Sequence, residues 1–147
     1  MMKLAVIKYN AGNIQSVSFA LERLGIPFSI TDTPEEIQTA DKVIFPGVGE
    51  ASTTMRHLIN KRLDQVIINL KQPVLGICLG MQLMCKHSEE NDTTCLGIFD
   101  GPVKRFIPVN DMKVPQMGWN QLTLTEGWLD PSLADEDVYF VHSYYVP

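Results

Sequence analysis

Cysteine is scarce in this chain, and so are clusters of basic residues and long apolar runs. The 147 residues include three cysteines, Cys78, Cys85 and Cys95, with no Cys-x-x-Cys pair among them. An odd number of cysteines without that spacing argues against a disulfide framework and against a structural zinc site. We therefore expect no metal site and a reduced, cytoplasmic location.

Concentrated positive charge is also missing. The formal net charge of -5 is spread along the sequence, and no run of Lys and Arg provides the positive stripe that nucleic acid or an anionic lipid surface requires. The apolar runs are far shorter than the ~20 residues that span a bilayer. We expect neither a nucleic-acid partner nor a membrane partner.

The composition is that of a folded domain. Hydrophobic residues make up 45% and charged residues 20% of the chain, a balance typical of globular proteins rather than disordered ones. The length is that of one ordinary domain. We therefore expect a single domain over residues 1–147.

Apolar segments alternate with amphipathic segments in the first two thirds of the chain. Strands are predicted at 4–9, 27–30, 42–45 and 74–77, and helices at 14–24, from Thr33-Pro34 onward, over 52–70 with a break near Lys61, and over 80–87. Such alternation predicts an α/β fold with a mostly parallel central sheet flanked by helices. Strands buried on both faces are near-continuously apolar, as these are.

The C-terminal part differs in its predicted elements. Short predicted strands lie between Gly, Pro and Asp turns, without a long helix, at 97–99, 103–106, 113–115, 120–125 and 138–146. This spacing predicts an antiparallel section laid against the parallel sheet.

The segment around Cys78 carries the strongest chemical signal. Gly76-Ile77-Cys78-Leu79-Gly80 joins a predicted strand to a predicted helix, which is the thiol version of a nucleophile elbow. The flanking glycines fit such a turn, because side chains there would collide with neighbouring elements. The N–H of Leu79 follows the nucleophile and is expected to donate to an oxyanion.

A free cysteine is more often a small buried hydrophobe than a nucleophile. Cys78 has a glycine two residues before it and two after it, Gly76 and Gly80, which we call the glycine frame. Cys85, on the predicted helix, and Cys95, in a polar loop, have no such frame, so we expect both to be packing or incidental residues. The glycine frame distinguishes Cys78 from them.

A second glycine-rich loop follows the neighbouring predicted strand. Pro46-Gly47-Val48-Gly49 lies at the carboxyl end of strand 42–45, and in open α/β sheets sites form at these ends. We expect Val48 or Gly49 to supply a second oxyanion N–H. The loop lacks Gly-Lys-Ser/Thr, which argues against a phosphate-binding loop.

These motifs resemble those of the class I, triad-type glutamine amidotransferases. The elbow at 76–82 and the loop at 46–49 carry the resemblance, and the segments 10–14, 115–120 and 139–145 are similar to the glutaminase subunit of imidazole glycerol phosphate synthase, from histidine biosynthesis. The resemblance spans the chain from its first predicted strand to its last residue. It implies hydrolysis of L-glutamine without a cofactor.

The resemblance also assigns roles to single residues. Cys78 would form a thioester with glutamine as ammonia leaves, and Leu79 and Val48 would provide the oxyanion hole. Glutamine would be held by a set of four residues: Gly49, Gln82, Ser143 and Tyr144. Asn13 and Trp119 match positions that face the cyclase subunit, the heterodimer partner that would receive the ammonia.

The catalytic base of the family is not found in this sequence. The three histidines are His57, His87 and His142, and His142 matches the family's substrate-side His-Ser-Tyr motif. The triad His and Glu belong to a later His-Pro-Glu motif. We therefore expect a C-terminally truncated domain with an open, incomplete sheet and little activity alone.

Three alternatives remain. The chain could serve another glutaminase, for anthranilate or pyridoxal phosphate synthesis, although several of those relatives carry His at the position of Met81. It could be a non-catalytic binding module that lost its triad. It could be a related cysteine hydrolase or chaperone, which would carry His where Leu79 stands.

Overall fold

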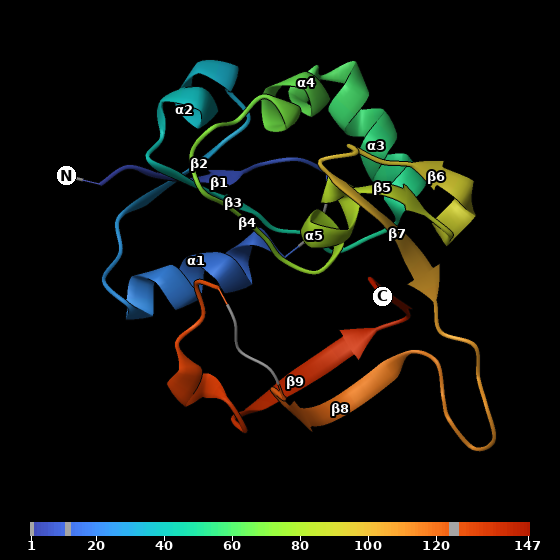
Figure 1. Cartoon of the computed structure of the whole chain (residues 1–147). Coiled ribbons are helices and arrows are strands. Elements are labelled where there is room, and N and C mark those ends of the chain that lie inside the picture. The colour runs from blue at the N-terminus through green and yellow to red at the C-terminus, as the bar shows by residue number, and fades with distance from the viewer. Residues whose placement is uncertain (1, 11–12, 124–126) are drawn as a thin grey trace. The chain divides into compact units, whose positions relative to one another are not determined.

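The computed structural model describes residues 2–10, 13–123 and 127–147 (Figure 1). Its contacts divide the chain into a first unit, Met1–Lys104 with Val146–Pro147, and a second unit, Arg105–Tyr145. The predicted turn at 10–13 and the predicted strand at 120–125 each extend into residues outside the described part, 11–12 and 124–125 respectively.

A parallel sheet forms the centre of the first unit. Its strands are β1 (Leu4–Ile7), β2 (Phe28–Thr31), β3 (Lys42–Phe45) and β4 (Val74–Gly76). They lie in the order β2-β1-β3-β4, and every neighbouring pair is parallel. The parallel sheet predicted from the alternation of segments is confirmed, because strands joined through helices pair in this way.

Helices cover both faces of this sheet. They are α1 (Ile14–Arg23), α2 (Pro34–Thr39), α3 (Ala51–Asn60), α4 (Leu63–Ile68) and α5 (Leu79–Met84). Figure 1 shows α1 on one side of the strands and α2, α3 and α4 on the other. Successive strand residues point to opposite faces of the sheet. Apolar side chains therefore project from both faces, and helices bury them on each side.

Two apolar clusters follow from this arrangement. Leu4 and Val6 of β1 pack with Leu21 of α1, whereas Ala5 and Ile7 belong to the larger cluster under the other helices. The four residues of β1 are all buried, which explains the unbroken apolar run. The outer strands β2 and β4 are more exposed, so the predicted burial on both faces holds for the inner strands only.

The helix ends follow local sequence signals. Helix α1 ends at Arg23, and Gly25 takes a φ of 65°, a conformation that glycine adopts without steric cost. The predicted break near Lys61 is confirmed, because Arg62 has a φ of 57° between α3 and α4. The helix predicted from Thr33-Pro34 onward is confirmed as α2, with Thr33 at its N-cap, although the Thr33 side chain makes no capping hydrogen bond.

The helix predicted over 80–87 is too long. Helix α5 ends at Met84, and Cys85–Ser88 form strand β5, which pairs with β6 (Thr93–Thr94) and β7 (Phe99–Arg105). Cys85 and His87 therefore lie on a strand. Pairing with two strands satisfies the backbone of 85–88 and overrides its helical propensity. The short η1 turn (Glu90–Asp92) joins β5 to β6.

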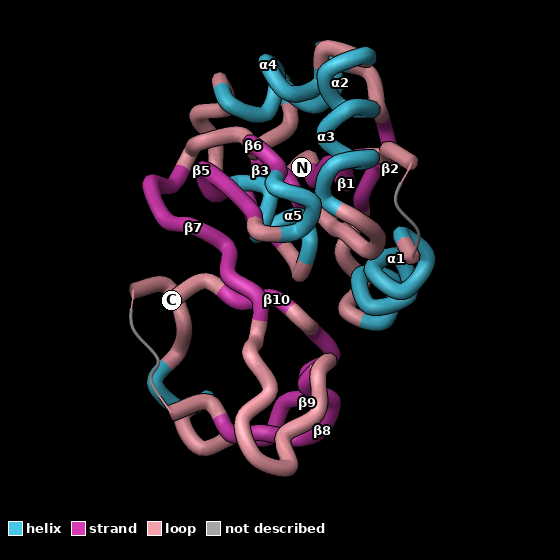
Figure 2. The backbone as a smooth tube through the Cα atoms, turned by 90° about the vertical axis from the view of Figure 1, so that its right-hand side faces the viewer, coloured by secondary structure: helices cyan, strands magenta, loops and turns pink. Residues whose placement is uncertain are grey.

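The second unit is built on an antiparallel hairpin. Strands β8 (Gln116–Gln121) and β9 (Asp137–His142) pair antiparallel with Trp119 opposite Tyr139, and Figure 2 shows them side by side. The η2 turn (Pro131–Leu133) and the two-residue strand β10 (Tyr144–Tyr145) complete the unit. The predicted antiparallel pairing is confirmed for β8 and β9, whereas β7 pairs parallel with β5. Residues 113–115 form no strand. Parts of the segments predicted at 97–99 and 103–106 belong to one strand, β7, while residues 97, 98 and 106 lie outside it.

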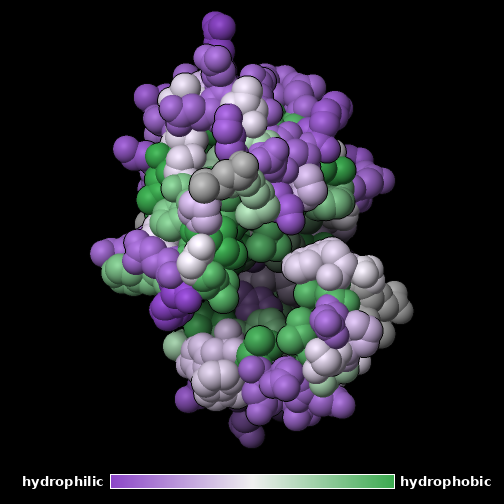
Figure 3. Space-filling view, turned by 90° about the vertical axis from the view of Figure 1, so that its left-hand side faces the viewer, coloured by the Kyte–Doolittle hydropathy of each residue, from purple (hydrophilic) through white to green (hydrophobic). Residues whose placement is uncertain are grey.

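Hydrophilic side chains cover much of the surface in Figure 3, with hydrophobic side chains in patches between them. No helix in the described part of the chain has the length and apolar character needed to cross a bilayer.

Two neighbouring residues of α3 test how this helix packs. The side chain of Leu58 is 0% exposed and that of Ile59 is 53% exposed. Because truncation of a buried leucine leaves a cavity, we expect Leu58→Ala to lower the free energy of unfolding by about 2–5 kcal/mol. Ile59→Ala is the matched control and should cost less than ~1 kcal/mol. Urea unfolding measures both, and equal losses would contradict this orientation of α3.

Candidate active site around Cys78

Cys78 lies on the sharp turn between β4 and α5. Its φ and ψ are 51° and -115°, a conformation that costs a residue with a side chain about 1–3 kcal/mol. Its side chain is exposed. The strained strand-to-helix turn predicted from the glycine frame is confirmed, and it presents the thiol to solvent.

The flanking glycines leave room for close backbone packing. A Cβ on Gly76 would lie 2.6 Å from the Cα of Met81, and a Cβ on Gly80 would lie 1.9 Å from the carbonyl oxygen of Phe45. Neither distance is possible for a real side chain. The predicted collision with neighbouring elements is therefore confirmed at both positions.

The 46–49 loop lies directly beside this turn. The N–H of Ile77 donates to the Phe45 carbonyl at 3.0 Å, and the N–H of Leu79 donates to the Gly47 carbonyl at 3.4 Å. A Cβ on Gly49 would lie 3.9 Å from Cδ2 of Leu79. The loop after β3 and the turn after β4 thus share the carboxyl edge of the sheet, as expected for neighbouring parallel strands.

The contact between Leu79 and Gly47 bears on the predicted oxyanion hole. At 3.4 Å it is a long hydrogen bond, yet it occupies the N–H that is expected to receive an oxyanion. Val48 is 45% exposed, and Gly49 has a φ of 136°, which a residue with a side chain rarely adopts. The oxyanion roles of Leu79 and Val48 stay predictions.

Gln82 lies one helical turn beyond Cys78. Its N–H donates to the Cys78 carbonyl at 3.0 Å, and residues separated by this spacing share a helix face. Its side chain is 7% exposed. Gln82 therefore lines the interior beneath the turn rather than its outer surface.

Tyr9 also contacts the site. From the sequence, Tyr9 was expected only at the end of the first strand, without a role in the site. Its side chain is 8% exposed, and its hydroxyl donates a hydrogen bond to the carbonyl of Pro46. Burial raises the pKa of Tyr9, and negative charge on Cys78 raises it further. A tyrosine at the carboxyl end of a buried first strand was the only sequence signal for this contact.

Glu50 caps helix α3 at the far end of the same loop. Its carboxylate accepts hydrogen bonds from the N–H groups of Ser52 at 2.7 Å and Thr53 at 2.9 Å. It also accepts from Nδ2 of Asn91 at 2.7 Å. The Glu90 carboxylate accepts from the N–H of Ala51 at 2.9 Å. Two carboxylates therefore join the start of α3 to the segment between β5 and β6.

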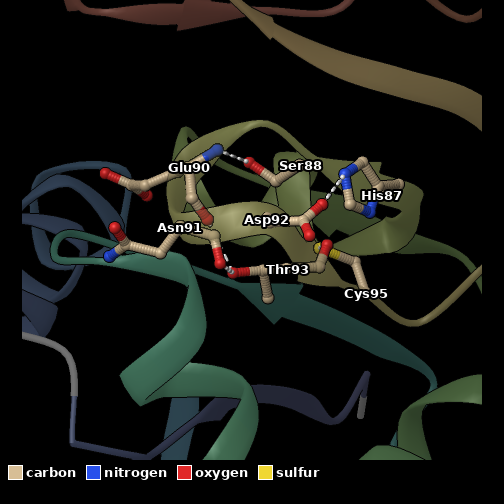
Figure 4. Close-up of polar contacts among 7 residues, drawn as sticks. All are labelled: His87, Ser88, Glu90, Asn91, Asp92, Thr93 and Cys95. Atoms are coloured by element: carbon tan, nitrogen blue, oxygen red, sulfur yellow. Dashed lines mark hydrogen bonds and ion pairs between the residues drawn. The ribbon is translucent and has the colours of Figure 1, made fainter.

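Figure 4 shows how this segment is held. The Glu90 N–H donates to Oγ of Ser88 at 3.2 Å, and the Thr93 hydroxyl donates to the Glu90 carbonyl at 2.6 Å. Nε2 of His87 lies 3.2 Å from a carboxylate oxygen of Asp92. These local bonds fix the tight turn that positions Glu90 and Asn91 against α3.

The two carboxylates differ in their pKa shifts. Burial raises the pKa of Glu50, but hydrogen bonds from Thr53, Ser52 and Asn91 outweigh it and lower the pKa from 4.5 to about 2. Burial raises the pKa of Glu90, the Ala51 N–H opposes this, and the charge of Glu50 raises it again. Glu50 is thus the carboxylate that the fold keeps ionised.

The other cysteines are buried. Cys85 is 2% and Cys95 is 8% exposed, and burial raises the pKa of both thiols, that of Cys95 to about 11. Their predicted role in packing fits this burial, although Cys95 lies in the apolar core rather than in a polar loop. Cys78 is the exposed thiol of the three.

The histidines occupy different settings. His57 lies in the last turn of α3 and its carbonyl accepts from the N–H of Lys61, and His87 lies on β5. In the second unit, Nδ1 of His142 lies 2.8 Å from the carbonyl of Tyr144. Among the residues that the structure describes, no three His, Cys, Asp or Glu side chains gather as a metal site.

The remaining predicted site residues lie in both units. Asn13, in the first unit, is exposed and its side chain accepts from the N–H of Ser16 at 3.3 Å at the start of α1. In the second unit, the backbone carbonyl of Ser143 accepts a hydrogen bond from the N–H of Phe106 at 3.0 Å. Trp119 is 68% exposed. The binding roles of Ser143, Tyr144, Asn13 and Trp119 stay predictions.

Comparison with known proteins places this geometry in context. Residues 5–147 match the family described as "Glutamine amidotransferase class-I". "Imidazole glycerol phosphate synthase subunit HisH" of Bacteroides thetaiotaomicron is 61% identical over 148 residues, covering 99% of this chain and 76% of the relative. The protein of the same name from Idiomarina loihiensis is 45% identical, covering 99% and 74%.

A solved structure supports the fold. The structure titled "Crystal structure of glutamine amidotransferase" superposes with a TM-score of 0.75 at 18% sequence identity, covering 97% of this chain and 72% of that one.

Gly80 provides a direct test of the close packing at the turn. A methyl group at this position would overlap the Phe45 carbonyl, so we expect Gly80→Ala to lower the free energy of unfolding by about 3 kcal/mol or more. At Gly101 the nearest atom to an added Cβ is 3.6 Å away, an ordinary contact, so Gly101→Ala should cost less than ~1 kcal/mol. Chemical denaturation of both variants makes the comparison, and a Gly80→Ala protein as stable as the Gly101→Ala control would contradict the packing.

The pH dependence of stability tests the Glu50 cap. Because folding lowers the pKa of Glu50 from 4.5 to about 2, its stabilisation is complete above about pH 4.5 and is lost as the pH falls toward 2. We expect Glu50→Gln to cost about 1 kcal/mol at pH 7, allowing for solvent screening of a partly exposed group, and less at pH 3. Urea unfolding at both pH values gives the difference.

Glu22→Gln is the control for this experiment, since Glu22 is exposed and lies within α1. It should change the free energy of unfolding by less than ~0.5 kcal/mol. A Glu50→Gln deficit that is undiminished at pH 3 would argue against the cap.

Proposed function

The chain belongs to the class I glutamine amidotransferase family, and from this premise we propose that it acts as the glutaminase subunit of an imidazole glycerol phosphate synthase. In this role it hydrolyses L-glutamine to glutamate and ammonia for histidine biosynthesis. We assign residues 1–147 to one glutamine amidotransferase domain. The observation that carries the proposal is the strained, exposed Cys78 beside the 46–49 loop.

The chemistry starts at the Cys78 sulfur. The thiolate attacks the amide carbon of glutamine, and the C=O bond electrons move onto oxygen to give a tetrahedral oxyanion. The C–N bond then breaks, ammonia leaves with a proton from a general acid, and a thioester remains. Water attacks the thioester, glutamate is released and the thiol is restored. Each step is an acyl transfer with no change of oxidation state, so the thiol and water complete it without a redox cofactor.

The oxyanion forms beside two backbone N–H groups. We assign it to Leu79, which follows the nucleophile, and to Val48 of the adjacent loop. In the structure the Leu79 N–H donates to the Gly47 carbonyl at 3.4 Å, so this contact must open before the oxyanion can bind. A long, weak bond is suited to such an exchange, because little stabilisation is lost when it breaks.

The resemblance to the family's motifs assigns the residues that hold glutamine. We propose Gly49, Gln82, Ser143 and Tyr144 for this role. The φ of 136° at Gly49 leaves its position without a side chain that would obstruct a ligand. Gln82 shares the helix face of Cys78 and supports the substrate from beneath.

A partner subunit receives the ammonia. The relatives are named as a subunit of a synthase, and we propose a heterodimer with the cyclase subunit. Trp119 is the best-exposed aromatic on strands β8 and β9, and exposed tryptophans are frequent interface anchors. We assign Trp119 and Asn13 to this interface. The three unpaired cysteines support a reduced, cytoplasmic setting.

Selective labelling tests the nucleophile. A chloroketone analogue of glutamine places its carbonyl where the amide would lie, so we expect it to alkylate Cys78 and to be blocked by excess glutamine. Mass mapping locates the label. Cys85 and Cys95 are internal controls, because both are buried and their pKa values are raised. Equal labelling of either control cysteine, or no protection by glutamine, would refute the assignment.

Substitution of Cys78 completes this test. In the synthase complex, Cys78→Ser should lower glutamine hydrolysis at least ~10³-fold, because removal of a nucleophile eliminates the thioester route. Cys95→Ser tests a buried thiol outside the site and should retain hydrolysis. Ammonia added directly should still support the partner's reaction in both variants.

A further inference from the structure

The hydroxyl of Tyr9 is buried at the point where three parts of the site meet. A Cβ on Gly47 would lie 2.6 Å from that hydroxyl oxygen, 2.5 Å from the N of Gly80 and 2.8 Å from the Cβ of Leu79. The end of β1, the 46–49 loop and the start of α5 are therefore in mutual contact. Only a residue without a side chain fits between them.

Tyr9 is itself firmly placed. Its side chain is 8% exposed, and its ring centroid lies 5.5 Å from that of Phe45 with the rings tilted by 59°. Phe45 is 0% exposed and ends strand β3. Close packing leaves the ring little room to move, so the position of its hydroxyl donor is fixed.

The hydrogen bond from Tyr9 fixes a peptide group of the loop. The acceptor is the carbonyl of Pro46, and the proline ring already fixes the φ of that residue. Holding the carbonyl as well defines the plane of the peptide that joins Pro46 to Gly47. The next peptide joins Gly47 to Val48 and carries the Gly47 carbonyl and the Val48 N–H. Its orientation is set by the φ and ψ of Gly47 relative to the peptide that Tyr9 holds.

The two loop carbonyls are held unequally. Tyr9 is buried and donates to the Pro46 carbonyl, whereas the Gly47 carbonyl accepts only a long 3.4 Å bond from Leu79. A buried hydrogen bond is costly to lose because its acceptor would be left without a partner. Any rearrangement of the loop is thus confined to the residues after Pro46.

We propose that Tyr9 is a positioning residue for catalysis, whose hydroxyl holds the peptide between Pro46 and Gly47 while the next peptide turns to present the Val48 N–H to the oxyanion formed at Cys78. In the structure the Gly47 carbonyl of that next peptide faces the Leu79 N–H, so the Val48 N–H on its opposite side points away until the peptide turns. The inference rests on the proposed glutaminase function and adds a residue to its machinery. Tyr9 touches neither substrate nor the reacting atoms in this scheme; it acts through Pro46. Burial, and to a smaller extent negative charge on Cys78, raises the pKa of Tyr9, so the hydroxyl stays protonated as a donor.

Tyr9→Phe tests this proposal, since it removes the hydroxyl and keeps the ring. In the synthase complex we expect kcat for glutamine hydrolysis to fall about tenfold or more, as for a displaced oxyanion donor, with KM within about twofold. Thr39→Val is the matched control, because it removes a hydroxyl that donates to the backbone carbonyl of Glu35 at 2.8 Å within α2. It should leave both constants unchanged.

Two labelling reagents separate positioning from general loosening of the site. The glutamine chloroketone passes through an adduct whose oxygen occupies the oxyanion hole, whereas iodoacetamide alkylates the thiol without one. In Tyr9→Phe the rate of Cys78 labelling by the chloroketone should fall with kcat, and the iodoacetamide rate should stay within about twofold. Replacement of Tyr9 by 3-fluorotyrosine, which retains the hydroxyl, should restore the parental ratio of the two rates.

The outcomes are distinct. An unchanged chloroketone rate in Tyr9→Phe, or an equal fall in both rates, overturns the positioning role. Loss of the parental ratio in the 3-fluorotyrosine protein also overturns it, and this protein decides the question if Tyr9→Phe does not fold. Failure of the chloroketone to label Cys78 in the parent protein instead counts against the proposed function.

Discussion

The site depends on the close approach of two backbones, where the start of α5 passes the end of β3. The room for this approach exists only because Gly80 has no side chain, since a Cβ there would lie 1.9 Å from the Phe45 carbonyl. This proximity places the turn at Cys78 against the 46–49 loop and makes the bond between Leu79 and Gly47 possible. The strain at Cys78 is maintained by the packing around it, which is how unusual backbone conformations persist at functional sites.

The 46–49 loop is held at both of its ends by buried or charged partners. Tyr9 holds the Pro46 carbonyl at one end, and at the other end Glu50 caps α3 and accepts from Asn91. The residues between these anchors contain two glycines and an exposed valine. Rigid ends with an adaptable centre suit a loop that must offer backbone N–H groups to a charge that exists only briefly.

Much of this arrangement could be predicted from the sequence, because its signals are local. The apolar segments gave the parallel strands, Gly25 marked the end of α1, and the glycines around Cys78 indicated the turn. The prediction failed where tertiary contacts decided the outcome. Strand β5 has a helical sequence but pairs with two strands, and the core position of Cys95 depends on packing between distant segments.

The contacts of Tyr9 and Glu50 were also beyond local patterns. Tyr9 reaches a carbonyl 37 positions along the chain and Glu50 accepts from a residue 41 positions away. Side-chain hydrogen bonds over such separations depend on the fold as a whole. Periodicity and spacing, which report neighbours along one element, contain no information about them.

The unequal exposure of the three cysteines has a consequence for oxidative damage. Peroxide and related oxidants attack accessible thiols first, and Cys78 is exposed while Cys85 and Cys95 are buried. Early oxidation therefore converts Cys78 to a sulfenic acid and removes the nucleophile before the core is altered. Because the oxidised side chain is exposed and not part of the packed core, reduction of the sulfenic acid by a thiol regenerates the site.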